Sequence, residues 1–365
     1  MLEKIIYILG VAFLFYAGYY LITSIGIFKK RKKVTNNNDD KKNFFAVIVA
    51  ARNEENVIGK LIDSLKKQSY PSEYFDIYVI VNNCTDNTAI EAKKAGAKVI
   101  SCTEKVSTKG EVLKYTFDLF KDNNKIDAYA IFDADNIVHH DFLAKMNDMI
   151  NSGYSVAQGF RDTKNISDNW LTSSYAILYY FQSLFLNESR YNMGRSSFLN
   201  GTGFVIKKEV IDKHGFNPKT VTEDVEFTAM CAINNEKIGF ATDAITYDEQ
   251  TNSFDVSWKQ RKRWSFGTME CLREYFPTLL KKGIKERNFE CFDVGLFYLS
   301  VISHVVFNLL PIFLLINIII HFDSLTFDNM LYKIIFIVIS YLFGVVVRII
   351  LLKRYNKSFK DNIGG

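Results

Sequence analysis

Cysteines are few in this sequence, and they lie far apart. The 365 residues contain five, none of them in a close pair or in a pattern with histidine: Cys84, Cys102, Cys231, Cys271 and Cys291. Structural zinc sites and disulfide frameworks need closely spaced ligands or a dense set of cysteines. The sequence therefore predicts neither, and a reducing cytosolic setting is the simplest expectation. An internal repeat is also lacking.

Positive charge is in small excess, and that excess is local. The formal net charge is +5, which matches the run of five basic residues at positions 29–33. A nucleic-acid-binding protein would instead spread its basic residues over a docking face. The charge thus argues against a nucleic-acid partner. Hydrophobic residues make up 48% of the chain, enough for one large α/β domain and a membrane part.

Three long apolar segments are present, at residues 1–28, 292–320 and 331–352. Residues 5–28 alone reach about 36 Å as a helix, which is enough to cross a bilayer. A secretory signal peptide would carry its basic residues before the apolar run, whereas here they follow it. We therefore expect three transmembrane helices and the lipid bilayer as a partner.

Basic residues also predict the orientation of these helices. Lys and Arg are retained on the cytoplasmic side, so the N-terminus should lie outside and the basic linker at residues 29–43 inside. Residues 321–330 contain no Lys or Arg, whereas the tail at residues 353–365 contains several. All three segments agree on a multi-pass protein of the cell membrane, with the domain after residue 43 and the tail both cytoplasmic.

Between residues 44 and 240 the sequence alternates between two patterns. Apolar runs at 44–50, 78–81, 99–100 and 128–132 suit buried parallel strands, and the stretches between them have helical spacing of apolar residues. The predicted fold class is α/β with a mostly parallel sheet. Polar residues follow several of the runs, and ligands bind at the carboxyl ends of such strands.

Three short polar signatures then occur in a fixed order. They are Asp133-Ala134-Asp135, Thr222-Glu223-Asp224, and Gln-Arg-Lys-Arg-Trp at residues 260–264. Paired carboxylates can bind a divalent cation, and a carboxylate can remove a proton from a hydroxyl group. In the last signature the first, fourth and fifth residues would share one face of a helix. Each signature alone is common, but their order makes coincidence improbable.

With these signatures, residues 44–264 resemble the membrane-bound family 2 glycosyltransferases of the cellulose, chitin and hyaluronan synthase type. The resemblance implies a GT-A-like nucleotide-sugar-binding domain at residues 44–250, interface helices at 251–291 that carry the Gln-x-x-Arg-Trp motif, and transmembrane helices. It implies an inverting hexosyltransferase that uses a nucleotide sugar, with UDP as the first choice, and extends a β-linked polysaccharide.

The same resemblance assigns roles to individual residues. Asp224 matches the catalytic base, with Glu223 beside it, and Asp135 and Asp133 match the ligands of Mg²⁺ or Mn²⁺. Donor binding is assigned to Glu54, Asp86, Lys109, Asp133 and Arg263, and acceptor binding to Gln260, Trp264 and Gly201.

Three positions depart from the family pattern, and several roles have simpler alternatives. Ala50 and Arg52 stand where proline and tyrosine are usual, and Asn82 stands where an acidic residue commonly meets the base. Asp86 has the residue type of a helix cap, whether or not it binds a ligand. The Gln-x-x-Arg-Trp helix could equally lie on the membrane surface. His139 and His140 are read as surface residues.

Two other functions stay open from the sequence. One is a glycosyltransferase that adds a single sugar and makes a glycolipid, and the other is a non-catalytic nucleotide-sugar sensor or scaffold. The acceptor is accordingly a carbohydrate or a lipid-linked molecule. Three helices could hardly enclose a polar tunnel for a polysaccharide, so polymer export would require self-association or a partner membrane protein.

Overall fold

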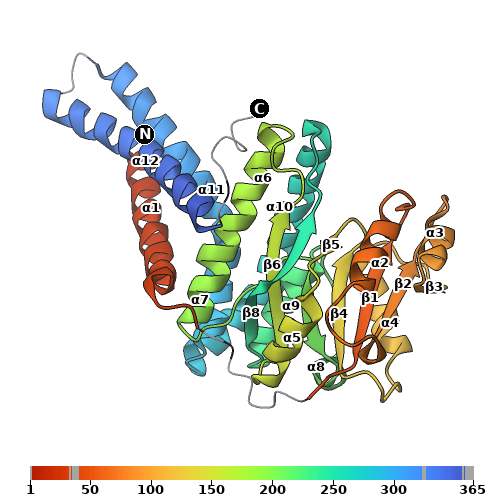
Figure 1. The fold of residues 1–365 in the computed structure, drawn as a ribbon. Coiled ribbons are helices and arrows are strands. Elements are labelled where there is room, and N and C mark those ends of the chain that lie inside the picture. Colours follow the sequence, from red (N-terminus) through yellow and green to blue (C-terminus); the bar gives the residue numbers. More distant parts are fainter. Residues whose placement is uncertain (1, 33, 35–40, 323–325, 356, 358–365) are drawn as a thin grey trace.

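The computed structural model describes residues 2–32, 34, 41–322, 326–355 and 357. Parts of the predicted linker and tail therefore lie outside the described residues. A sheet with helices on both faces forms one side of the molecule, and the helices α1, α11 and α12 form the other (Figure 1). The long helix α10 (Phe254–Lys285) and the helix α6 (Trp170–Phe181) lie between these two parts.

The sheet has eight strands in the order β3-β2-β1-β4-β7-β6-β8-β5. Strands β3, β2, β1 and β4 run parallel to one another, and β6 is parallel to β8. Strand β7 is antiparallel to both β4 and β6, and β5 is antiparallel to β8. The α/β class with a mostly parallel sheet is therefore confirmed. The strands are β1 (Phe45–Ala51), β2 (Phe75–Val81), β3 (Lys98–Ser101), β4 (Ala128–Asp133), β5 (Ile137–Val138), β6 (Val156–Thr163), β7 (Phe204–Lys207) and β8 (Ile238–Asp248).

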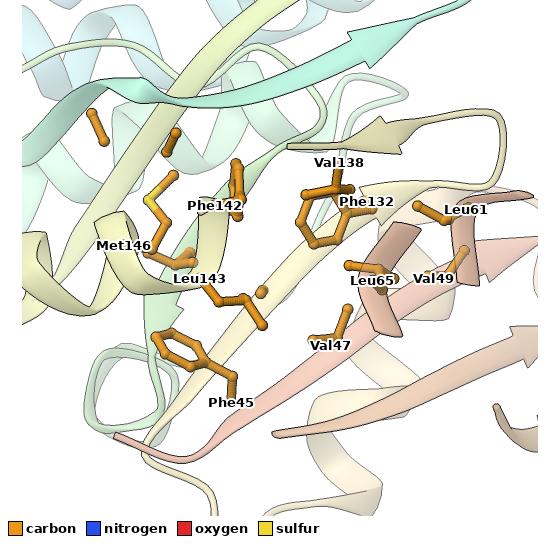
Figure 2. Packing of buried hydrophobic residues seen from close by; sticks show 14 of the residues in the cluster. Phe45, Val47, Val49, Leu61, Leu65, Phe132, Val138, Phe142, Leu143 and Met146 are labelled. Atoms are coloured by element: carbon orange, nitrogen blue, oxygen red, sulfur yellow. The ribbon is translucent and has the colours of Figure 1, made fainter. Parts of the chain in front are cut away.

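Strand β1 shows why the apolar runs are continuous rather than alternating. Successive side chains of a strand point to opposite faces, and both faces of this sheet are covered. Phe45, Val47 and Val49 pack against α2 (Ile58–Lys66) and α5 (Phe142–Asn151), as Figure 2 shows. Ala46 and Ile48 belong to the core on the other face, with α4 (Lys109–Leu119), α8 (Lys208–His214) and α9 (Glu223–Ile233).

The remaining short helices connect these elements. They are α3 (Thr88–Lys94), α7 (Ser189–Asn192), the 3₁₀ helix η2 (Ser72–Tyr74) and the π-helix η3 (Gln182–Glu188). The predicted interface region at 251–291 contains one long helix, α10, and the beginning of α11. A separate core cluster of α9, α10 and α11 includes Ala229, Cys271, Leu279 and Tyr298, so α10 and α11 are packed onto the sheet domain.

Among the residues that the structure describes, three helices are long and apolar enough to cross a membrane. They are α1 (Leu2–Ser24), which continues into the 3₁₀ helix η1 (Ile25–Phe28), α11 (Phe289–Ile320) and α12 (Phe327–Arg354). The three predicted apolar segments fall on these helices, although α11 begins before residue 292 and α12 extends beyond 331–352 at both ends. Tyr16 and Tyr19 of α1 donate hydrogen bonds to Leu299 O and Asp293 Oδ1 of α11, at 2.8 and 2.7 Å.

Candidate active site

The carboxyl ends of the central strands meet at one edge of the sheet. In the parallel register Ala50 of β1 lies beside Asp133, the last residue of β4, and Ala51 lies beside Val81, the last residue of β2. The polar residues that follow these strands are therefore brought together, as expected for an open parallel sheet.

A cavity of about 510 Å³ opens beside this edge. Eight of the predicted site residues line it: Lys109, Asp133, Gly201, Glu223, Asp224, Gln260, Arg263 and Trp264. Asp135 instead lines a neighbouring cavity of about 690 Å³, whose wall also includes Gln260 and Arg263. Glu54 and Asp86 line neither cavity. The structure thus gathers most of the predicted residues and places Arg263 between the two cavities.

Lys109 joins two of the sequence signatures and the Gly201 loop through its ammonium group. Nζ donates to Asp133 Oδ1 at 2.5 Å and to Gly201 O at 2.6 Å, and it lies 3.8 Å from Glu223 Oε1. A capping box between Thr108 and Glu111 starts α4 at this residue. The cation is thus fixed between the carboxylates of the first two signatures.

Glu223 and Asp224 lie in the first turn of α9, where Glu223 is buried and Asp224 is half-buried. Burial raises the pKa of both carboxyl groups, and the positive charge of Lys109 acts against that rise. Thr222 is the N-cap residue of α9, but its side chain makes no capping hydrogen bond to the helix. Gly201 has φ +91°, and a Cβ there would lie 3.5 Å from Asp224 Oδ2, so the backbone of this loop closely approaches the carboxylate.

The Asp133-Ala134-Asp135 turn is held by a buried polar network. The amide of Asp133 donates to Asn136 Oδ1 and Thr202 Oγ1, at 3.1 and 3.0 Å. Asn136 also donates to Asp135 Oδ1 at 3.2 Å and to Asp248 Oδ1 at 2.7 Å. Burial, together with the charges of Asp133 and Asp248, raises the pKa of Asp135 to about 7. The turn therefore concentrates negative charge.

The sequence analysis did not identify two residues of this region, Arg161 and Asp248. Arg161 of β6 lines the cavity that contains Asp224. It forms an ion pair with Asp248 at the end of β8 and donates to Asn200 O at 2.8 Å. Its guanidinium lies 4.0 Å from the centre of the Tyr179 ring. No local sequence pattern marked Arg161, because its partners come from segments far away in the chain.

Helix α10 presents the third signature to the cavity on one face, as its spacing predicted. Tyr175 of α6 supports this face, because its hydroxyl donates to Gln260 Oε1 at 3.2 Å and its ring meets Trp264 edge-on with centroids 6.0 Å apart. Gly267 brings α10 against Thr222, since a Cβ there would lie 2.4 Å from Thr222 Cγ2. The helix that carries the third signature therefore packs directly against Thr222 of the second signature.

The predicted nucleotide loops have local structural roles. The carboxylate of Asp86 accepts hydrogen bonds from the amides of Glu55 and Thr88, at 3.1 and 3.0 Å, and so holds the turn that leads into α3, although the N-cap residue of this helix is Asn87. Burial, and then the charges of Asp133 and Asp86, raise the pKa of the Glu54 carboxyl group. His139 and His140 cluster with Asp141, and none of the three lines either cavity.

Comparison with known proteins agrees with this site. Residues 42–267 match the family described as Glycosyltransferase like family 2. The chain is 24% identical over 282 residues to "Probable glycosyltransferase YdaM" of Bacillus subtilis, an alignment that covers 70% of this chain and 63% of that protein. It is 26% identical over 241 residues to the beta-monoglucosyldiacylglycerol synthase of Synechocystis sp., covering 62% of this chain and 48% of the relative.

A solved structure shows the same arrangement over nearly the whole chain. The mannosyltransferase PcManGT from Pyrobaculum calidifontis, determined in complex with GDP-Man and Mn²⁺, superposes with a TM-score of 0.67 and 14% identity and covers 96% of this chain and 97% of its own. This likeness shows the GT-A-like fold. The chain belongs to glycosyltransferase family 2, and it is a glycosyltransferase.

Proposed function

We propose that this enzyme transfers one hexose, with inversion, from a nucleotide sugar to a hydroxyl group of a membrane lipid. One observation carries the proposal. The cavity that contains Asp224 is also lined by Phe297, a residue of the candidate membrane span α11. Leu186, Phe198 and Val225 extend this apolar side of the wall. A lipid acceptor could thus place its hydroxyl at the carboxylates and its apolar part toward the membrane helices.

The polar side of the cavity suits a nucleotide-sugar donor. Lys109 and Arg263 supply cations for a diphosphate, and a guanidinium can bind two phosphate oxygens at once. Departure of a nucleoside diphosphate increases its negative charge, which these cations would offset. Asp224 would accept the proton of the acceptor hydroxyl as the new bond forms. Glu223, held near Lys109, would keep that cation in place.

The residues present also fit a divalent cation. Asp133, Asp135 and Asp248 gather carboxylate oxygens, the ligand type that Mg²⁺ and Mn²⁺ prefer. Burial, and then the charges of Asp133 and Asp248, raise the pKa of Asp135 to about 7, so a cation bound beside these carboxylates would be favourable. Asp135 and Asp133 would hold the ion, which would offset the charge of the leaving diphosphate.

The relatives support a lipid acceptor. The Synechocystis protein is named as a synthase of monoglucosyldiacylglycerol, a glycolipid. This chain spans 63% and 48% of the lengths of the two relatives described above, so their names alone do not identify its acceptor. Three candidate spans support a cavity beside the membrane, and the basic residues after the first span predict a cytoplasmic catalytic domain in a multi-pass protein.

Polysaccharide synthesis is the second candidate, and one observation favours it. Gln260, Arg263 and Trp264 share the cavity wall with Asp224, so a growing chain end could be held near the donor. Export of such a polymer would still require a polar tunnel lined by protein. The glycolipid product makes no such demand.

The test is a panel of labelled nucleotide sugars offered to the purified chain with diacylglycerol vesicles or with soluble oligosaccharides. We expect transfer to the lipid, and Phe297→Ser should lower that transfer without changing donor affinity. As a matched control, Phe289→Ser alters an exposed ring of the same helix that does not line the cavity. Transfer to soluble oligosaccharides alone, insensitive to Phe297→Ser, would exclude a lipid acceptor.

A further inference from the structure

The segment at residues 182–192 lies between the cavity and the candidate membrane helices. It begins with the π-helix η3, and Gln182, Leu186 and Asn187 of this helix line the cavity. Turns of π-helix are rare and occur frequently at functional sites. Asn187 is fixed in turn by the amide of Phe198, which donates to its Oδ1 at 2.9 Å. One wall of the site is therefore built from this helix.

The last residue of η3 connects this wall to two membrane segments. Glu188 has a fully buried side chain, and its Oε1 accepts from Arg31 Nε at 3.1 Å and from Arg354 Nη2 at 2.5 Å. Arg31 follows the first span, and Arg354 is the last residue of α12. The carboxylate thus joins the ends of the first and third spans.

The next two residues continue the connection. Ser189 Oγ donates to Thr23 O of α1 at 2.6 Å. Arg190, 1% exposed, forms an ion pair with Asp293 of α11, with Nε to Oδ2 at 2.7 Å and Nη2 to Oδ1 at 3.0 Å. Three successive residues therefore contact all three candidate spans, directly after the residues that line the cavity.

The Glu188 carboxylate is fully buried, and both of its ion-pair partners are arginines from the membrane segments. A carboxylate removed from water is stable only when cations and hydrogen bonds replace that water. Its second oxygen, Oε2, is buried and accepts no hydrogen bond from the described residues, so both arginines act on a single atom. Loss of either arginine should move the end of η3, because the buried charge must find other partners.

We propose that Glu188 is a positioning residue, which holds the acceptor wall of the cavity in place through its ion pairs with Arg31 and Arg354. It touches no substrate and acts through Leu186 and Asn187, which precede it in η3. The inference rests on the proposed assignment of the apolar end of the cavity to the acceptor. It places control of acceptor binding at the junction of the first and third spans with the catalytic domain.

The test compares Arg354→Gln, Arg354→Lys and Glu188→Gln in the full chain reconstituted in lipid nanodiscs. Acceptor KM, kcat and the donor Kd are measured for each. Since a displacement of about 1 Å in a site can cost about 100-fold in rate, we expect Arg354→Gln and Glu188→Gln to lower kcat/KM for the acceptor by about 10-fold to 100-fold. Donor affinity should stay unchanged, because Lys109 and Arg263 lie on other elements.

Two further variants separate positioning from general destabilisation. Arg354→Lys keeps the charge and should recover part of the lost kcat/KM. Lys98→Gln removes an exposed ion pair with Asp76, 2.8 Å long, on the edge strand β3, and should change neither constant. Because Arg31 and Arg354 contact the same oxygen, the Arg31→Gln and Arg354→Gln effects should be non-additive when combined.

The proposal is overturned if Arg354→Gln leaves the acceptor kcat/KM unchanged. It is also overturned if donor affinity falls in parallel, or if Arg354→Lys is no better than Arg354→Gln. The lipid-acceptor proposal fails separately, when the wild-type chain uses only soluble sugars. In that case the same variants are measured with the soluble acceptor, and the result decides on Glu188 independently.

Discussion

At the scale of single residues, the site is a small set of charges held inside the protein. Lys109 neutralises part of the charge of Asp133 and Glu223, and Asp224 stands beside the backbone of Gly201. The resemblance to family 2 glycosyltransferases predicted these residues, because each lies in a short contiguous stretch of sequence that can be matched to the family. Arg161 was missed, since its partner Asp248 comes from another strand and only the paired register of β6 and β8 brings them together.

Replacement of Asp224 by Asn tests the assignment of the base. The amide keeps the shape of the side chain but cannot accept the proton, so kcat should fall by about 100-fold or more. Donor Kd, measured by calorimetry, should hardly change. Asp63→Asn, on the exposed side of α2, is the matched control. Normal turnover of the Asp224→Asn variant would exclude this residue as the base.

The pH dependence of the reaction follows from burial of the same group. Asp224 must be deprotonated to act, and burial raises its pKa above the ordinary aspartate value of about 4. Activity should therefore be lost as pH falls through this raised value, at a higher pH than an exposed aspartate would give. Lys109→Gln removes a charge that lowers the pKa, so it should move the acidic limb of kcat/KM further upward. An unchanged limb would argue against Asp224.

At the scale of elements, the close approach of α10 to α9 brings the second and third signatures together. The helical face of Gln260, Arg263 and Trp264 was predicted from its period, but the partner of that face was not, because Tyr175 lies on α6. The π-helical course of residues 182–188 was also not predicted from the sequence.

Gly267→Ala tests this contact between α10 and the Thr222 loop. An added Cβ would meet Thr222 Cγ2 at 2.4 Å, and such overpacking costs about 1–3 kcal/mol, more than the gain of up to about 1 kcal/mol from alanine in a helix. We expect a lower thermal midpoint and slower transfer. Gly59→Ala in α2 meets nothing within 4 Å and should be neutral or stabilising. Equal behaviour of the two variants would contradict the proposed contact.

At the scale of the whole molecule, the membrane helices and the catalytic domain are joined by charged residues. The basic cluster was interpreted as a topology signal, yet Arg31 pairs with Glu188, and Lys32 Nζ donates to the Tyr154 hydroxyl at 3.1 Å. Composition predicted the three spans and the α/β domain. Their junction depends on residues far apart in the chain, such as Arg190 and Asp293, so no local pattern indicated it.

Protease protection tests the predicted orientation. In sealed right-side-out vesicles, added protease should leave residues 34–285 intact, because the basic residues after the first span keep this segment inside. The same protease should cut the segment after the vesicles are permeabilised. Cleavage between residues 34 and 285 in intact vesicles would reverse the predicted topology.

The size of the product tests the central claim most directly. The purified chain is incubated in vesicles that contain diacylglycerol, with increasing concentrations of its preferred nucleotide sugar, and the products are measured by mass spectrometry. If the cavity takes a lipid hydroxyl and releases it after one transfer, every product should be a lipid that carries one hexose, at all donor concentrations. Trp264→Ala should then change the rate but not the mass of the product. A ladder of products that lengthens with donor and shortens in Trp264→Ala would contradict single transfer and show a polysaccharide synthase instead.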